Sequence, residues 1–306
     1  MLLQSSKKWQ SVFSRTRIAR CLTNTTKPYL SDATSTHFGF SDVPIEQKES
    51  KVRHVFETVA DSYDVMNDFM SAGLHRLWKD YFTSLLQVEK MAQQARQMDT
   101  PLSILDVAGG TGDISFRLLQ QAGCLERAKS SGVDQVQITV CDINAEMLRV
   151  GKARAYERFG SGVMESSQAL TFVQGNAQSL TFPDNSFDVY TIAFGLRNVT
   201  DVDLALREAH RILKPGGRYL CLEFSQLPSP LMQQAYDAYS FNIIPTLGEL
   251  VANDRASYQY LVESIRKFSN QNELQQRMEA AGMEQVSYQN LSGGIVAIHE
   301  GWKGLL

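Results

Sequence analysis

The sequence has no long hydrophobic run, no acidic residue near its start and no metal-binding pattern of cysteines or histidines. None of its 306 residues falls in an uninterrupted apolar run of about 18, the length that a membrane-spanning helix needs. The cysteines have neither disulfide-framework nor zinc spacing, and the histidines are scattered; the four cysteines are Cys21, Cys124, Cys141 and Cys221. We therefore expect a globular protein from a reducing compartment, with no metal.

The missing acids distinguish the first 30 residues from the rest. This segment carries six basic residues, and the first acid is Asp32. Its Ser and Thr content and its interspersed apolar residues are typical of a mitochondrial transit peptide, and it lacks the continuous apolar core of a secretory signal. A disordered basic tail is the alternative interpretation. We predict a transit peptide over residues 1–30, a Ser-, Gly- and Pro-containing linker over 31–50, and one domain over 51–306.

The remaining chain is acidic. Subtracting the six leader charges from the formal net charge of −3 leaves −9 on the rest of the chain. Because phosphate binding needs a basic face, this charge disfavours nucleic acid as a partner.

Apolar periodicity predicts an α/β fold. Two helical patterns over 51–86 precede an alternation of strands and helices. The predicted strands cover residues 103–107, 137–141, 169–173, 187–192 and 219–224, and the predicted helices cover 114–121, 145–158 and 202–212. Such alternation predicts a parallel sheet with helices on both faces. A helix that begins with a capping box at Asn270 precedes two strands, around 284–289 and 295–299, which we expect to form a hairpin.

Residues 228–268 interrupt the alternation. Their apolar and aromatic residues predict extra helices inserted after the fifth strand. Ligands of such sheets bind beyond the carboxyl ends of the strands, so the insert is predicted to cover a substrate. Ordinary helix packing is the alternative, and the spacing leaves both open.

A glycine-rich loop follows the first strand of the sheet. The segment Asp106-Val-Ala-Gly-Gly-Thr-Gly-Asp113 lets the backbone approach a ligand closely and leads into a helix with free N–H groups. The third glycine of a dinucleotide fingerprint is missing. The carboxylates of Asp106 and Asp113 would repel a pyrophosphate and attract a sulfonium and an ammonium group. The loop therefore favours S-adenosylmethionine over NAD.

Two later strand ends carry polar residues that suit a nucleoside. Asp142, at the tip of the second strand, is suited to accept hydrogen bonds from two ribose hydroxyls; alternatively it caps the next helix. Asn176, with a neighbouring backbone N–H, is suited to the adenine edge; alternatively it is a turn residue.

Together these features resemble a class I S-adenosylmethionine-dependent methyltransferase. Longer strings narrow the resemblance to the ubiquinone/menaquinone biosynthesis C-methyltransferases, over residues 51–303. The strings occupy residues 63–68, 74–79, 194–199, 221–225 and 251–258. The resemblance implies a Rossmann-like, mostly parallel seven-stranded sheet that ends in an antiparallel hairpin.

The resemblance also implies the site residues. S-adenosylmethionine would contact Thr111, Asp142, Asn176 and Ala177, and Gly109 and Asp106 would line the same cleft. Family members often carry Ser where this chain has Ala193, so a hydroxyl contact is lost there.

The implied reaction is C-methylation of a polyprenylated methoxy-benzoquinol. Arg197 and Asn198 are the catalytic candidates, and Arg197 is expected to stabilise the ring oxygen. The other substrate-pocket candidates are Tyr63, Asp64, Asn67, His75 and Asp254. The residues alone favour another interpretation, in which Asp64 and Asp68 are helix-surface charges and His75 is a packed helix residue.

The lipid tail of that substrate implies peripheral association with the matrix face of the mitochondrial inner membrane. The resemblance further implies docking with other enzymes of the ubiquinone biosynthesis complex and leaves homodimerisation open. Three alternatives remain: a methyltransferase of another lipid or quinol, an NAD-dependent oxidoreductase and a non-catalytic scaffold.

Overall fold

A computed structural model describes residues 35–59, 67–68, 71, 73–123, 136–166 and 169–305. The chain divides into two units, residues 1–33 and 34–306, and the fold below is that of the second. The predicted transit peptide lies outside the described residues, as do the pocket candidates Tyr63 and Asp64.

The second unit begins with a small hairpin and a helix. Strands β1 (Ser35–Phe38) and β2 (Ser41–Pro44) pair antiparallel, and α1 (Ile45–Val59) follows. Gly39, at a φ of 59°, forms the turn. The structure thus corrects the linker predicted over 31–50, because residues 35–50 are folded. The Gly and Pro that suggested a linker instead form the tight turn, at Gly39, and the end of β2, at Pro44.

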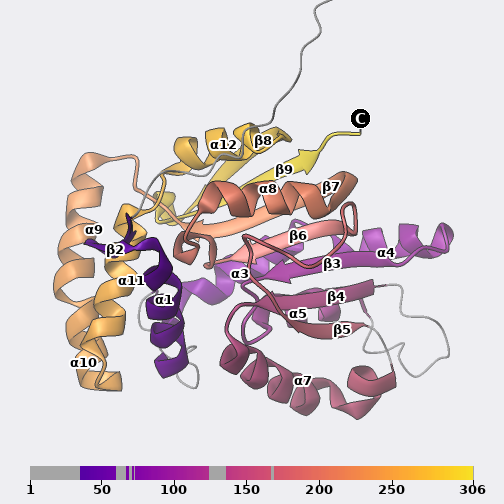
Figure 1. Cartoon of the computed structure of the whole chain (residues 1–306), viewed down its shortest axis with the longest axis horizontal. Coiled ribbons are helices and arrows are strands. Elements are labelled where there is room, and N and C mark those ends of the chain that lie inside the picture. The colour runs from indigo at the N-terminus through magenta and orange to yellow at the C-terminus, as the bar shows by residue number, and fades with distance from the viewer. Residues whose placement is uncertain are drawn as a thin grey trace, which may run out of the picture. The chain divides into compact units, whose positions relative to one another are not determined.

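The central sheet has seven strands in the order β5-β4-β3-β6-β7-β9-β8. The first five are parallel and the last two join antiparallel. The strands are β3 (Leu102–Val107), β4 (Val136–Asp142), β5 (Leu170–Gln174), β6 (Phe187–Ala193), β7 (Leu213–Phe224), β8 (Met283–Leu291) and β9 (Val296–Lys303). This arrangement confirms the predicted mostly parallel sheet with a closing hairpin (Figure 1).

Helices cover both faces of the sheet, so successive strand residues are buried on opposite sides. Leu220 belongs to one hydrophobic cluster with buried residues of α3 (Leu74–Ser84), α4 (Val88–Gln97), α5 (Asp113–Gln121) and α7 (Ala145–Ser166). Tyr219 packs on the opposite face with α8 (Val202–Ile212) and α12 (Gln271–Ala280). Helix α12 begins with the predicted capping box of Asn270 and Glu273. Among the described helices on the two faces of the sheet, α4 is the one that the sequence did not predict.

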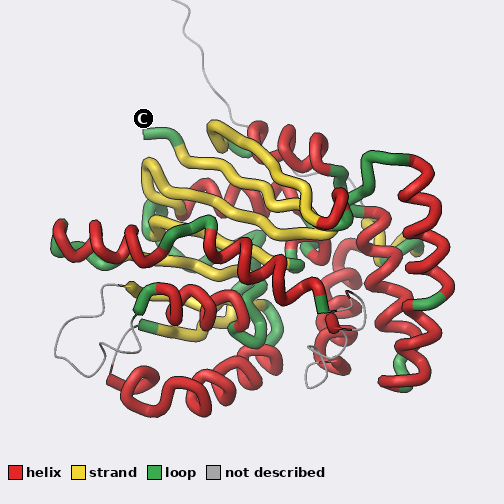
Figure 2. The backbone as a smooth tube through the Cα atoms, turned by 180° about the vertical axis from the view of Figure 1, so that it is seen from behind, coloured by secondary structure: helices red, strands yellow, loops and turns green. Residues whose placement is uncertain are grey.

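The predicted insert consists of α9 (Pro230–Asn242), α10 (Ile244–Ala252) and α11 (Arg255–Lys267). These helices lie together at one end of the sheet, beside α1 (Figures 1 and 2). Five buried side chains of the insert join the main hydrophobic core: Ile244, Tyr258, Leu261, Val262 and Ile265. Helix packing therefore accounts for the inner face of the insert. Among the described residues, no helix is both long and apolar enough to cross a membrane.

Candidate active site

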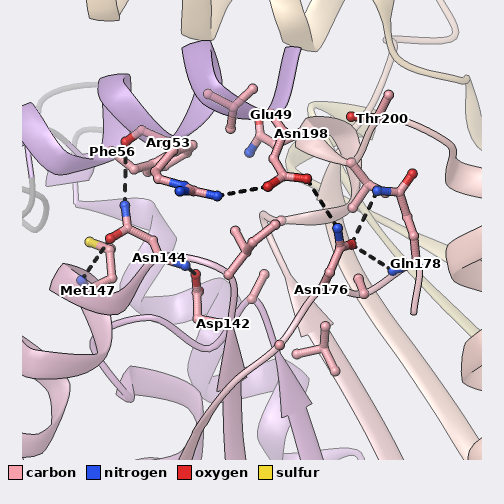
Figure 3. A pocket seen from close by; sticks show the side chains of 18 of the residues that line it. Glu49, Arg53, Phe56, Asp142, Asn144, Met147, Asn176, Gln178, Asn198 and Thr200 are labelled. Carbon is pink, nitrogen blue, oxygen red and sulfur yellow. Dashed lines mark hydrogen bonds and ion pairs between the residues drawn. The ribbon is translucent and has the colours of Figure 1, made fainter. Parts of the chain in front are cut away.

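A cavity lies where the parallel strands end. Its walls come from the residues at the carboxyl ends of β3, β4, β5 and β6, and from α1 (Figure 3). The chain order reverses between β3 and β6, and ligands of open α/β sheets bind at such a switch point. The polar residues of the cavity are Glu49, Arg53, Asp142, Asn144, Asn176, Gln178, Asn198 and Thr200.

The glycine loop approaches the neighbouring loop closely at the bottom of this cavity. Ala108 has a φ of 52° and Gly110 a φ of 46°, so the backbone here is in the left-handed region that most residues avoid. A Cβ added to Gly195 would lie 2.3 Å from the Cβ of Ala108. The two loops can therefore pack this closely only because position 195 is glycine.

Asp142 lies in the cavity wall, as the sequence predicts. Its Oδ2 accepts a hydrogen bond from the backbone N–H of Gly110 at 2.9 Å, and its Oδ1 accepts one from that of Asn144 at 2.8 Å. Burial raises the pKa of Asp142 to about 6. The capping role belongs to Asn144, whose Oδ1 accepts the N–H groups of Glu146 and Met147 at 2.9 and 3.2 Å. Asp142 is thus left to hold the glycine loop and to face the cavity.

Asn176 and Ala177 also line the cavity. The Oδ1 of Asn176 accepts the N–H of Gln178 at 2.9 Å, which makes it a turn residue as well. Its Nδ2 donates to Glu49 Oε2 at 3.2 Å. Glu49 in turn pairs with Arg53 at 2.8 Å, one turn further along α1.

Helix α1 therefore forms the roof of the cavity, through Glu49, Val52, Arg53 and Phe56. This role was not predicted, because Glu49 lies in the segment that we expected to be a linker. The Glu49–Arg53 spacing of four residues, beside the apolar positions 52, 55 and 56, was the available signal.

Asp106, Gly109 and Thr111, predicted in the same cleft, do not line the cavity. Asp106 is fully buried and accepts hydrogen bonds from the hydroxyls of Ser115 at 2.7 Å and Thr191 at 3.0 Å. Burial raises its pKa to about 6. These contacts tie the start of α5 and strand β6 to the glycine loop, so Asp106 shapes the loop from beneath.

Arg197 is placed differently from the prediction. Its guanidinium is buried, pairs with Glu223 of β7 at 2.8 Å and lies over the ring of Phe224. It also donates to the carbonyl of Phe194 at 2.5 Å. Arg197 is absent from the cavity wall. The structure does not support its predicted contact with the substrate, because a buried carboxylate already holds the cation.

Asn198, the neighbour of Arg197, does line the cavity. Phe194, four residues earlier, has a φ of 57°, a strained conformation that persists only where its surroundings fix it. The segment 194–199, which we call the Phe194 turn, is fixed from three sides. Glu223 accepts the N–H of Arg197, Tyr260 of α11 donates to Asn198, and Lys48 of α1 donates to the carbonyl of Val199.

The described pocket candidates Asn67, His75 and Asp254 are not part of the cavity wall. His75 is buried and contacts the Ser71 hydroxyl at 3.0 Å, and burial lowers its pKa to about 4. Asn67 accepts the hydroxyl of Ser71 through its carbonyl. Asp254 caps α11 by accepting the N–H of Ser257. The structure thus assigns His75 and Asp254 local packing and capping contacts.

Comparison with known proteins decides between the chemistries that this cavity allows. A profile of the ubiE/COQ5 methyltransferase family matches residues 45–303. The chain belongs to this family. It is an S-adenosylmethionine-dependent C-methyltransferase.

The sequence of this chain matches those of its relatives along most of their length. The chain is 52% identical to the ubiquinone/menaquinone biosynthesis C-methyltransferase UbiE of Rhodopseudomonas palustris, over 88% of this chain and 97% of the relative. It is 50% identical to the mitochondrial 2-methoxy-6-polyprenyl-1,4-benzoquinol methylase of Danio rerio, over 89% of this chain and 86% of the relative. The mitochondrial protein of the same description from Bos taurus is 48% identical, over 89% and 84%.

The cavity fits S-adenosylmethionine. A carboxylate on one wall suits ribose hydroxyls, and Gly195 lines the cavity without a side chain. Ile143 and Met147 supply apolar surface beside Asp142.

We expect the affinity for S-adenosylmethionine to fall as the pH is lowered through about 6. Only the ionised Asp142 accepts hydrogen bonds on both oxygens, and burial raises its pKa to about 6. Calorimetric titrations from pH 8 to pH 5 should show a loss approaching tenfold per pH unit below that pKa. In the Asp142→Asn variant the dependence should vanish. An affinity of the unchanged protein that stays constant between pH 8 and pH 5 would contradict the expectation.

Proposed function

We propose that this enzyme methylates a ring carbon of a polyprenylated methoxy-benzoquinol, a step of ubiquinone biosynthesis. The names of the zebrafish and bovine relatives, both 2-methoxy-6-polyprenyl-1,4-benzoquinol methylases, support this substrate. The observation that carries the proposal is the cavity itself. It combines a nucleoside-binding wall around Asp142 with a neutral amide donor, Asn198, on the opposite side and apolar surface between them.

The residues of the cavity divide between the two ligands. Asp142 binds the ribose hydroxyls, and Asn176 with the backbone of Ala177 binds the adenine edge. When bound, S-adenosylmethionine supplies a methyl group that the ring carbon takes as the carbon–sulfur bond breaks, and the ring then loses a proton. The roof formed by α1 would limit the access of water and help to hold the two reactants together.

Asn198 takes the role predicted for Arg197. A quinol ring is more nucleophilic when its oxygen is ionised. A hydrogen-bond donor at that oxygen stabilises the ionised form and thereby favours the reaction. Arg197 is bound by Glu223, whereas Asn198 presents its side chain to the cavity. Arg197 instead holds the Phe194 turn in place.

The test is transfer of an isotope-labelled methyl group to a short-tailed methoxy-benzoquinol kept in its reduced form. We expect the label on a ring carbon, with one S-adenosylhomocysteine formed per product. Label on a quinol oxygen, or no transfer by a protein that binds S-adenosylmethionine, would refute the proposal.

Replacing Asn198 with alanine is expected to lower kcat about 20-fold, the effect of losing one hydrogen bond to a charged group. The affinity for S-adenosylmethionine should change less than threefold, because the ribose and adenine contacts remain. Stopped assays with the quinol, combined with calorimetry, measure the two quantities separately. A kcat within twofold of the unchanged protein would exclude the role of Asn198.

We also propose that residues 1–30 direct the chain to mitochondria and that the enzyme works at the matrix face of the inner membrane. The mitochondrial relatives and the acid-free leader support the first part. The lipid tail of the proposed substrate supports the second, and with it docking to other enzymes of the pathway. The helices α9–α11, which lie beside the roof helix α1, are proposed to cover that tail.

A further inference from the structure

A hydrogen bond from the insert helix α11 determines how the side-chain amide of Asn198 is oriented. The hydroxyl of Tyr260 donates to Asn198 Oδ1 at 3.0 Å. On its other side, Asn198 Nδ2 lies 3.5 Å from the carbonyl oxygen of Phe194. A carbonyl oxygen only accepts hydrogen bonds, so the amide nitrogen must face Phe194 and the amide oxygen must face Tyr260. The side-chain amide therefore has one defined orientation.

The ring of Tyr260 is itself fixed in position. It stacks on Phe38 with ring centroids 4.1 Å apart and packs against Val52 and Val55 of α1. Its side chain is buried, and burial raises the pKa of its hydroxyl, which stays protonated and able to donate. Packing thus holds the ring, while the hydroxyl is directed at the amide of Asn198.

An amide carbonyl occupied by Tyr260 leaves the nitrogen of Asn198 as the group that can meet a ligand in the cavity. The nitrogen carries two hydrogens, and the carbonyl of Phe194 accepts at most one of them. The contact with the Phe194 carbonyl is long, at 3.5 Å, and does not hold the amide by itself. Without the Tyr260 hydroxyl, the amide could therefore rotate and present its oxygen, which would repel a negatively charged ring oxygen.

We propose that Tyr260 is a positioning residue, which orients the Asn198 amide so that an N–H faces the quinol oxygen. This role rests on the proposed function, since it concerns the same ring oxygen. The insert would then contribute to the reaction, because Tyr260 of α11 supplies the hydrogen bond that orients Asn198.

The variant Tyr260→Phe tests this role, because it removes the hydroxyl and keeps the ring that packs on Phe38 and α1. We expect kcat with the short-tailed quinol to fall five- to tenfold, with an unchanged affinity for S-adenosylmethionine. Tyr288→Phe is a matched control, since the hydroxyl of Tyr288 donates to Asn272 Oδ1 at 3.1 Å on the surface. That control should keep the full kcat.

A double-mutant cycle separates positioning from general support of the fold. In an Asn198→Ala background, Tyr260→Phe should change kcat less than twofold, because the group it orients is gone. Additive losses in the double variant would overturn the proposal. So would an unchanged kcat in Tyr260→Phe, or a loss of cofactor affinity as large as the loss of kcat.

Failure of the proposed function gives a different result. An unchanged protein that binds S-adenosylmethionine and does not methylate the quinol would contradict the substrate, and the role of Tyr260 would fall with it. An active unchanged protein with an equally active Tyr260→Phe variant would contradict the positioning role alone.

Discussion

The variant Asp142→Ala is expected to bind S-adenosylmethionine at least 100-fold more weakly than the unchanged protein. Two losses add up. The ribose hydroxyls lose a charged acceptor, which is worth about 1.5–3 kcal/mol for a single hydrogen bond. The glycine loop loses the bond from the N–H of Gly110 to Asp142 Oδ2, which spans 2.9 Å and holds the loop against β4. Calorimetric titration of the full chain measures the affinity.

Asp188→Ala is the matched control. Asp188 Oδ2 also accepts a backbone N–H, that of Ser103 at 2.8 Å, but Asp188 is not part of the cavity wall. Both variants lose a carboxylate that supports β3 or the loop after it, and only Asp142→Ala should lose the cofactor. A folded Asp142→Ala variant with an affinity within threefold of the unchanged protein would refute the assignment.

The second large effect is expected from Glu223→Ala, which should lower the free energy of unfolding by about 3–5 kcal/mol. Glu223 and Arg197 are both almost completely buried, with side-chain exposures of 2% and 3%, and they pair at 2.8 Å. Removing the carboxylate leaves a guanidinium without a counter-ion in the interior, which is far more costly than removing both charges. Urea unfolding followed by fluorescence gives the free energy.

The double variant Arg197→Met, Glu223→Leu distinguishes a lost charge pair from lost packing. It should recover most of the stability that Glu223→Ala loses, because no buried charge remains. It should not recover activity, since the N–H of Arg197 and the carbonyl of Phe194 lose the partners that fix the Phe194 turn. A loss below 1 kcal/mol in Glu223→Ala would show that the pair does not hold the turn.

The sheet could be predicted from the sequence because its strands are buried on both faces and alternate with amphipathic helices. Helix α8 was predicted with the bounds that the structure shows, Val202–Ile212. The glycine loop and Asp142 were predicted for a related reason. The chemistry of their ligand requires particular residue types directly at strand ends, and that signal is local in the sequence.

The orientation of Arg197 could not be predicted, because it depends on a partner 26 residues away on the next strand. The sequence places Arg197 at the correct edge of the sheet but does not show that the side chain of Glu223 lies next to it. The hairpin β1–β2 was missed for the same reason. The backbone N–H of Phe40 is bound by Glu263, and Phe38 stacks on Tyr260, so residues from the insert stabilise a segment whose own composition resembles a linker.

The most direct test of the account is a crystal structure of the full chain with S-adenosylhomocysteine. The account predicts both ribose hydroxyls within hydrogen-bond distance of the Asp142 carboxylate, the adenine beside Asn176 and Ala177, and the sulfur on the side of the cavity that holds Asn198. A ligand bound outside this cavity, or bound in it without contact to Asp142, would contradict the account.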